Sequence, residues 1–248
     1  MSDLSPLSRP LLGKNILVTG GAKRVGRGLA LALANAGANV AITFRDSVGE
    51  AAQVVSAIQA LKVTALALQA DVRSEKSVIN AVASVAKAFG GLDLLVNNAA
   101  VFESAPLGEI TLDQWDRVFE TNTRGPFLMA REALPYLKAA HGRIVNLGSL
   151  GGIHAWSTHA HYCASKAALH MLTQTMAKAF APEVSVNCVA PGFIQIGEGS
   201  SESGHFAART PMGRNGSVQD VAEAVLFFAT GPHFVTGQIL AVDGGLGL

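Results

Sequence analysis

The feature that most constrains the fold of this sequence is a regular alternation of short β-rich runs with segments of helical periodicity. The first run, Ile16 to Thr19, ends at a glycine pair, and apolar residues then recur at helical spacing from Val25 to Ala36. This succession repeats along the chain, with a turn residue at most boundaries. Strands that alternate with helices pair in parallel through right-handed crossovers. The pattern therefore predicts an α/β fold with helices on both faces of a parallel sheet.

The alternation extends over the whole chain. We expect a seven-stranded parallel sheet, with strands at residues 16–19, 39–44, 64–68, 92–96, 143–147, 185–189 and 239–242. No shift in composition divides the 248 residues and no repeat occurs, so residues 1–248 should form a single doubly wound domain. Residues 1–13 are interpreted as a leader. Residues 193–212, which are rich in Gly and Ser between 197 and 208, are expected to form a mobile substrate flap.

Composition and charge exclude several classes of protein. Hydrophobic residues make up 49% of the chain and charged residues only 15%, which is the reverse of a disordered protein. The 19 basic and 18 acidic residues give a net charge of +1, so no basic excess favours nucleic acid. The uncharged stretch 28–44 is interrupted by Asn35, Gly37 and Asn39 and cannot be a spanning helix, and the N-terminus does not resemble a signal peptide. We expect a cytoplasmic protein that binds neither nucleic acid nor membrane.

Cysteine and histidine do not indicate a metal site. Cys163 and Cys188 are too few for a disulfide framework, and their apolar surroundings predict buried thiols. His159 and His161 form a pair, but no further ligand stands at matching spacing. No bound metal is expected.

A glycine turn follows the first predicted strand. The segment Gly20 to Gly26 connects this strand to a helix N-terminus, where backbone N–H groups can approach a pyrophosphate. Plain strand–helix turns also contain glycine, so the turn alone is a weak signal. In doubly wound sheets, however, ligands bind beyond the carboxyl ends of the strands. The turn therefore lies where a nucleotide would bind.

Two other segments suggest proton transfer at the same edge. Tyr162 and Lys166 are four residues apart and share one helical face. An ammonium near a tyrosine stabilises the phenolate, so such a tyrosine can exchange a proton with a substrate oxygen near neutral pH. Ser149 follows the fifth strand and should lie in the same crevice. A surface pair is the simpler interpretation of Tyr162 and Lys166, but Ser149 favours a catalytic one.

Taken together, these residues resemble the short-chain dehydrogenase/reductase family over nearly the whole chain, from Lys14 to Gly245. The match includes the glycine turn and the following segments: Asp71-Val72, Asn97-Asn98-Ala99, Asn122, Ser149 with Tyr162-Cys163-Ala164-Ser165-Lys166, Pro191-Gly192, and Val242-Asp243-Gly244-Gly245. The resemblance implies a Rossmann-type domain that binds a nicotinamide dinucleotide.

The resemblance also implies roles for the matched residues. Tyr162 would be the general acid, and Lys166 would lower its pKa and bond the nicotinamide ribose. Ser149 would bond the substrate oxygen, and Asn122 would interrupt its helix and hold a water of the proton relay. The full set of expected cofactor-binding residues is Gly20, Lys23, Arg24, Val25, Arg45, Ser47, Asp71, Val72, Asn98, Ala99, Tyr162, Lys166, Pro191, Gly192 and Ile194.

The residues after the second strand predict NADPH as the cofactor. A 2′-phosphate carries nearly two negative charges, which arginine binds through bidentate bonds. Arg45 follows Phe44, where NAD-specific relatives usually carry Asp. Arg24 should converge on the same spot, and Ser47 could add a hydroxyl. Asp46 is the rival, because an acidic residue at about this distance from the glycine turn can bind the ribose of NAD.

Within the family, the closest resemblance is to bacterial pteridine reductase-like members. The shared features are Lys23-Arg24 in the turn, Asn97-Asn98-Ala99-Ala100-Val101-Phe102 with Pro106-Leu107, and Asn122 with Pro126. The residue that matches Phe102 stacks on a pterin in that group; a plain loop hydrophobe is the alternative. Three residues depart from the pattern: Ser149 replaces an Asp of the pteridine reductases, Ile196 replaces a common Thr, and Ala100 a common Gly.

Three functions follow as hypotheses. The first is an NADPH-dependent oxidoreductase that transfers hydride to a C=N or C=O bond of a small substrate. The favoured substrate is a pteridine-like heterocycle bound by Phe102, Ser149 and Tyr162. The second is a ketone reductase, such as a 3-oxoacyl-thioester (acyl carrier protein) reductase, which Ser149 would suit. The third, a non-catalytic NADP-binding module, is disfavoured because Tyr162 and Lys166 are both present. The family resemblance further suggests a homotetramer.

Overall fold

The structure is a computed structural model that describes residues 9–197 and 201–248. Of the expected leader, residues 1–8 therefore lie outside the described residues. Residues 9–13 already belong to the packed domain. Leu11 is buried and its backbone N–H donates to the Ala36 carbonyl at 2.9 Å.

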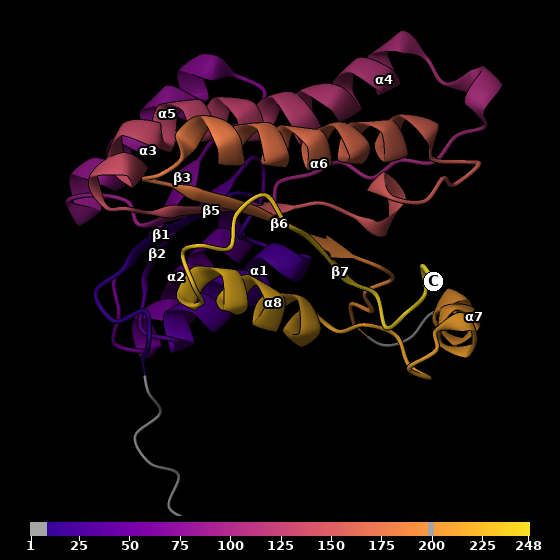
Figure 1. Ribbon diagram of the computed structural model, residues 1–248. Coiled ribbons are helices and arrows are strands. Elements are labelled where there is room, and N and C mark those ends of the chain that lie inside the picture. The colour runs from indigo at the N-terminus through magenta and orange to yellow at the C-terminus, as the bar shows by residue number, and fades with distance from the viewer. Residues whose placement is uncertain (1–8, 198–200) are drawn as a thin grey trace, which may run out of the picture.

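A seven-stranded parallel sheet forms the centre of the molecule, as predicted (Figure 1). Its strands are β1 (Asn15–Val18), β2 (Asn39–Phe44), β3 (Ala65–Gln69), β4 (Leu94–Asn97), β5 (Arg143–Leu147), β6 (Ser185–Pro191) and β7 (Ile239–Val242). The strand order is β3-β2-β1-β4-β5-β6-β7, so the order reverses between β1 and β4. In a doubly wound sheet this reversal opens a crevice beyond the carboxyl ends of the strands.

Helices cover both faces of the sheet (Figure 1). One face carries α1 (Arg24–Asn35), α2 (Val48–Ala60) and α8 (Val218–Thr230), and the other carries α3 (Glu75–Phe89), α4 (Leu112–Phe119), α5 (Gly125–Ala139) and α6 (Ala160–Phe180). Each layer has its own apolar core against the sheet. The strands between the two edges are mostly buried, which explains their nearly continuous apolar sequences, whereas the edge strands β3 and β7 are only partly buried.

Local signals in the sequence begin several of these helices. The Ser74 hydroxyl accepts from a backbone N–H in the first turn of α3. Thr111 with Gln114 forms a capping box at α4, and Ser217 with Asp220 forms another at α8. Such caps satisfy backbone N–H groups that the helix itself leaves unpaired. The predicted helix starts at these positions are confirmed.

One interruption lies where it was expected, and one helix was not expected. The helical region after Thr111 is interrupted by a π-helical turn, η2 (Glu120–Arg124), just before Pro126 where the break was expected. Within the expected flap 193–212, residues Ser201–Arg209 form a helix, α7, which the sequence analysis did not foresee. The Phe206 ring stacks on Phe193, with centroids 4.3 Å apart. This contact joins the helix to the segment that follows β6.

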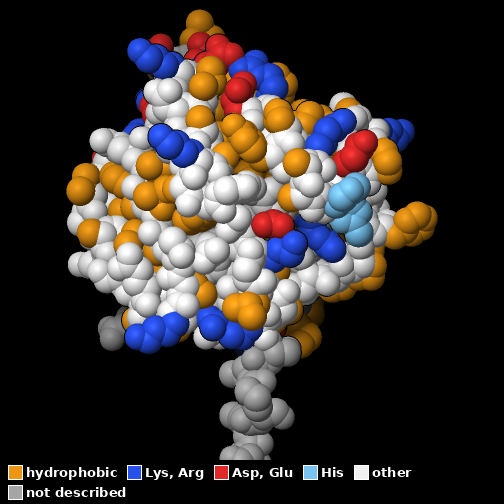
Figure 2. All heavy atoms as spheres, turned by 90° about the vertical axis from the view of Figure 1, so that its left-hand side faces the viewer, with side chains coloured by type: hydrophobic (Ala, Val, Ile, Leu, Met, Phe, Trp, Pro, Cys, Tyr) orange, Lys and Arg blue, Asp and Glu red, His pale blue; other side chains and the backbone are white. Residues whose placement is uncertain are grey.

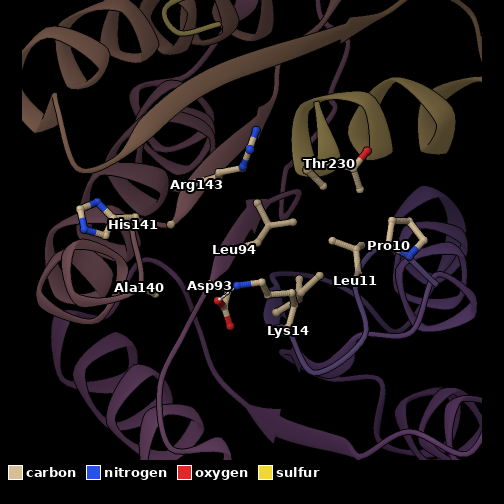
Figure 3. A pocket seen from close by; sticks show the side chains of 12 residues that line it. Pro10, Leu11, Lys14, Asp93, Leu94, Ala140, His141, Arg143 and Thr230 are labelled. Atoms are coloured by element: carbon tan, nitrogen blue, oxygen red, sulfur yellow. Dashed lines mark hydrogen bonds and ion pairs between the residues drawn. The ribbon is translucent and has the colours of Figure 1, made fainter. Parts of the chain in front are cut away.

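The amino edge of the sheet has a cavity of about 240 Å³ (Figure 3). This side of the molecule faces the viewer in Figure 2, where basic side chains surround an acidic one beside a histidine. Lys14 pairs with Asp93 at 2.8 Å, and Arg143 donates to the carbonyls of Phe228 and Gly231 at the end of α8. These charged groups join elements of the fold, so the cavity is a structural feature of the edge opposite the candidate site. In the described part of the chain, no helix is long and apolar enough to cross a membrane.

Candidate active site

The turn between β1 and α1 is built around its glycines. Gly20 has a φ of +63°, and a Cβ on Gly26 would lie 2.3 Å from the Gly20 carbonyl oxygen. Arg24 also has a positive φ, +50°, in the position where most family members carry glycine. A non-glycine residue in this conformation costs roughly 1 kcal/mol. The first turn of α1 contains no acidic residue, so its N-terminus suits an anion.

Asn98 and Ala99 lock this turn to the end of β4. The Asn98 side-chain amide donates to the carbonyls of Thr19 and Gly20 at 2.8 and 3.1 Å. The backbone N–H groups of Asn98 and Ala99 both donate to the Thr19 hydroxyl at 3.0 Å. The structure thus gives both residues a part in shaping the crevice. Contact with a cofactor, as the resemblance implies, stays a prediction.

Two of the basic residues near the expected 2′-phosphate site are paired with acids, and their convergence on that phosphate stays a prediction. Arg45 Nε lies 2.6 Å from Asp46, and Lys23 Nζ lies 2.8 Å from Glu50. Arg24 has no ion-pair partner among the described residues. Asp46 therefore neutralises Arg45 locally in this structure. The sequence analysis named Asp46 as a rival ligand and did not foresee this pairing.

Other residues that are predicted to bind the cofactor lie at the same edge of the sheet. Ser47 stands at the N-cap of α2 but its hydroxyl makes no cap hydrogen bond. Asp71 is held by Arg73 through a 2.6 Å ion pair that lowers the pKa of its carboxyl, and Val72 is buried against Gly125. The sequence analysis missed Arg73. Its position two residues after Asp71 was the available signal.

The residues at the carboxyl end of β6 form another side of the crevice. Pro191 is the last residue of β6, and a Cβ on Gly192 would lie 2.8 Å from the Cβ of Asp243, so only glycine fits there. Ile194 forms an isolated parallel bridge with Gly216, which ties the start of the flap to the segment before α8. These residues lie where they were predicted, and their part in binding a cofactor remains a prediction.

Lys166 and Tyr162 share one face of α6, as the four-residue spacing predicts. Lys166 is 3% exposed, its Nζ donates to the Leu147 carbonyl at 2.7 Å, and burial lowers its pKa to about 8. Nζ lies 5.8 Å from the centroid of the Tyr162 ring. Burial raises the pKa of the Tyr162 phenol, and a hydrogen bond with Ser149 opposes that rise. The expected lowering of the Tyr162 pKa by Lys166 is thus not seen, because the ammonium is turned towards Leu147.

Ser149 is placed beside Tyr162 by a short turn after β5. It is 4% exposed and caps the 3-10 turn η3 (Leu150–Gly152), where its hydroxyl accepts from the Gly151 N–H at 3.1 Å. The hydroxyl lies near enough to the Tyr162 phenol to oppose the rise of its pKa. The two side chains are therefore placed to share one substrate oxygen.

Asn122 lies in the π-helical turn η2 and is fully buried. Its amide donates to the Val101 carbonyl at 2.9 Å and to the Ser165 hydroxyl at 3.0 Å, and its oxygen accepts from the Val101 N–H at 2.8 Å. Asn122 thus joins the loop after β4 to α6. The interruption of the helix is confirmed, whereas the implied water site stays a prediction.

Aromatic rings surround the phenol of Tyr162. Phe102 is 62% exposed, stacks on His159 with centroids 4.7 Å apart, and meets Tyr162 edge-on at 4.8 Å. Trp156 lies nearly parallel to Tyr162 at 6.1 Å. The sequence analysis named Phe102 but missed Trp156 and His159. One tryptophan and three histidines in the segment between Ser149 and Tyr162 were the signal that could have shown them.

The site contains no recognisable metal centre. No group of three or more His, Cys, Asp or Glu residues in the described ranges could hold a metal ion. Cys163 and Cys188 are both free thiols, and burial raises the pKa of Cys188 to about 12. The chemistry offered by the described side chains is proton transfer and hydrogen bonding.

Comparisons with known proteins agree with this geometry. The family model described as enoyl-(acyl carrier protein) reductase matches residues 20–247. The short chain dehydrogenase/reductase AacuN of Aspergillus aculeatus is 36% identical over 95% of this chain and 96% of its own. The 3-oxoacyl-[acyl-carrier-protein] reductase FabG of Staphylococcus epidermidis is 35% identical over 95% of this chain and 99% of its own.

A solved structure extends the likeness to three dimensions. A short-chain dehydrogenase from Burkholderia cenocepacia, solved in complex with NADP, is 38% identical and superposes with a TM-score of 0.90 over 96% of this chain and 100% of its own. Sequence motifs, fold and relatives thus agree over nearly the full length. The chain belongs to the short-chain dehydrogenase/reductase family of oxidoreductases.

Proposed function

We propose that this protein is an NADPH-dependent reductase that transfers hydride to a carbonyl carbon of a small substrate. The observation that carries the proposal is the convergence of Ser149, Tyr162 and Lys166 at the carboxyl edge of the sheet, beside the glycine turn. The nicotinamide of NADPH, when bound, supplies the hydride.

The residues present fit NADPH. The first turn of α1 has no acid, Arg24 has no ion-pair partner among the described residues, and the Ser47 hydroxyl makes no cap bond. An arginine and a hydroxyl are suitable donors for a ribose 2′-phosphate. The Burkholderia cenocepacia relative, whose structure contains NADP, supports the same choice. These groups would hold the phosphates and the adenosine ribose.

Proton transfer would be the work of Tyr162. The phenol, which burial keeps protonated, donates its proton to the substrate oxygen as that oxygen becomes an alkoxide. The Ser149 hydroxyl bonds the same oxygen and orients it. Lys166, whose pKa burial lowers to about 8, would then supply a proton that restores the Tyr162 phenolate to the phenol. The protein supplies orientation and prearranged hydrogen bonds.

The substrate class is inferred from the rings around the phenol. Phe102, Trp156 and His159 offer flat apolar faces next to Tyr162, which suits a planar ring substrate. A pteridine-like heterocycle is one such ligand. Ser149, however, stands where the pteridine reductases carry Asp, so we favour a ring-bearing ketone.

A second candidate is a 3-oxoacyl thioester. It is supported by the FabG relative and by Ser149, which suits a ketone oxygen. A flexible acyl chain would gain less from the aromatic faces than a ring would. The two candidates therefore differ in their dependence on Phe102.

The deciding experiment is an NADPH-oxidation assay with three substrates at equal concentration. We would compare a bicyclic aryl ketone, dihydrobiopterin and an acetoacetyl thioester. Higher kcat/KM for the ketone supports the proposal, and higher kcat/KM for the thioester supports the second candidate. Oxidation of none of the three by the folded protein would refute the proposed reaction.

We also propose a homotetramer that packs through the α4–α6 side. Exposed apolar side chains gather there, including Trp115 at 37%, Phe127 at 41% and Met171 at 62% exposure. Burial of such a surface between copies would stabilise an assembly. Light scattering coupled to size exclusion measures the mass directly, and a monomer of 25.6 kDa would refute the proposal.

A further inference from the structure

The turn that carries Ser149 is packed around a buried histidine that the proposed chemistry does not use. His170 lies on α6, one turn beyond Lys166, and is 8% exposed. A Cβ on Gly148 would lie 2.3 Å from His170 Nε2, and a Cβ on Gly152 would lie 2.6 Å from Cε1. The backbone on both sides of Ser149 therefore approaches the imidazole more closely than any residue with a side chain would allow.

Hydrogen bonds join the ring to both ends of this turn. The Ser149 N–H lies 3.5 Å from His170 Nε2 and points its hydrogen at that atom. A Cβ on Gly152 would lie 2.9 Å from His170 Nδ1, so this nitrogen faces the Gly152 backbone, and an interaction there raises the His170 pKa as expected for a ring N–H that donates. A single neutral tautomer, with the proton on Nδ1, satisfies both contacts. Protonation of Nε2 would instead set two donors against each other.

The surroundings keep the imidazole neutral. Burial and the charge of Lys166 lower the His170 pKa to about 4. Cys188 on β6 lies on the other side of Gly148, with its Sγ 2.6 Å from a Cβ placed there, and its raised pKa makes it an uncharged thiol. The η3 turn places uncharged backbone groups next to the His170 ring. Lys166 is thus the one charge whose influence on the ring must be considered.

We propose that His170 is a positioning residue for the reductase reaction. Its imidazole holds the Ser149–Gly152 turn against α6 and thereby fixes the Ser149 hydroxyl relative to Tyr162 and Lys166, which belong to the same helix. The proposal rests on the proposed function, because it assigns to His170 the alignment of those three groups. His170 itself touches neither substrate nor cofactor.

Three variants test the role of the Nε2 acceptor. His170→Leu keeps a buried side chain but removes the acceptor, whereas His170→Gln offers an amide oxygen in its place. His161→Leu is the matched control: His161 is buried on the same helix, and neither of its ring nitrogens has a hydrogen-bond partner in the part of the chain that is described. Each variant is assayed for kcat and KM, and NADPH affinity is measured by fluorescence titration.

We expect His170→Leu to lower kcat at least about 10-fold while the NADPH Kd stays within about twofold, since only the transition-state alignment is disturbed. His170→Gln should restore kcat to within about threefold of the wild type. His161→Leu should match the wild type. Unchanged kcat in His170→Leu overturns the proposal, as does an equal loss in folded His170→Leu and His170→Gln.

A measurement on the wild type does not depend on whether a variant folds. Nitrogen-15 NMR of the histidine rings at pH 7 reports the tautomer of His170. A neutral ring protonated on Nδ1 supports the proposal, and a charged ring or one protonated on Nε2 overturns it. Failure of the proposed function would appear separately, as a folded wild-type protein that oxidises NADPH with none of the carbonyl substrates.

Discussion

The pair formed by Arg45 and Asp46 makes a quantitative prediction about cofactor choice. Arg45 Nε lies 2.6 Å from the Asp46 carboxylate, and the two side chains are 55% and 72% exposed. An ion pair as exposed as this contributes only about 0–1 kcal/mol, so a 2′-phosphate with nearly two charges can displace Asp46 from Arg45. Replacement of Arg45 by alanine would remove this donor and leave the aspartate unpaired beside the phosphate.

The loss of the arginine donor and the repulsion from the unpaired aspartate can be estimated separately. A charge-assisted hydrogen bond from a mostly exposed arginine contributes about 1–1.5 kcal/mol. Repulsion between the freed Asp46 and the phosphate adds roughly 0.5–1 kcal/mol at this exposure. Together they correspond to about 2 kcal/mol, or about a 30-fold rise in the NADPH Kd for Arg45→Ala. NADH lacks the phosphate, so its Kd should change less than about twofold.

The double variant separates the two contributions. In Arg45→Ala with Asp46→Asn the repulsion is absent, and the NADPH Kd should rise only about 5- to 10-fold. Asp46→Asn alone should tighten NADPH a few-fold. Arg131→Ala is the matched control, because Arg131 also pairs with the acid that follows it, Glu132 at 2.8 Å, but lies on α5.

Fluorescence titration with NADPH and NADH measures all five proteins, and steady-state kinetics checks the same ratios. Wild-type protein that prefers NADH would refute the reasoning and make Asp46 the residue that selects the cofactor. Equal weakening of NADPH and NADH in Arg45→Ala would also refute it, because the loss would then not concern the 2′-phosphate.

Three further predictions follow from the same site. Tyr162→Phe should lower kcat at least about 100-fold while NADPH titration remains normal, because the phenol proton is lost; near-normal turnover would exclude Tyr162 as the acid. Phe102→Ala should raise KM for a planar ketone far more than for an acetoacetyl thioester, and equal losses would remove the case for a planar substrate. The His170 pKa is lowered in the folded protein, so below about pH 6.5 the unfolded chain binds more protons than the folded protein does. The stability of the folded protein should therefore fall as the pH drops from 6.5 towards 4. The expected loss between pH 7 and 5 is about 2 kcal/mol, and a wild-type Tm that falls no more than that of His170→Gln over this range would contradict it.

Local sequence was sufficient to predict most of the fold. Residues 39–44, 143–147 and 239–242 were predicted as strands and form β2, β5 and β7 with the same limits. Helix starts at Thr111 and Ser217 followed from capping residues whose partners lie within one turn. Such features depend on neighbours in the chain, so a pattern of hydrophobic and capping residues is enough to place them.

The candidate site was partly predictable for the same reason. Tyr162 and Lys166 share a face because they are four residues apart on a helix, and strand ends in a parallel sheet meet at one edge. The sequence could not show that Lys166 donates to Leu147, because that contact crosses from α6 to β5. It also could not show that burial raises the pKa of Tyr162, because burial depends on every element packed around the ring.

The remaining features of the fold and of the candidate site were decided by tertiary packing alone. The sequence determined a parallel α/β domain with a glycine turn and a tyrosine and a lysine on one helical face, since each depends on composition or spacing over a few residues. Only the tertiary structure placed Phe206 on Phe193, Trp156 and Phe102 around Tyr162, and His170 between Gly148 and Gly152. The physical reason is that these contacts join residues of different segments, where no helical or strand periodicity records which side chains will meet.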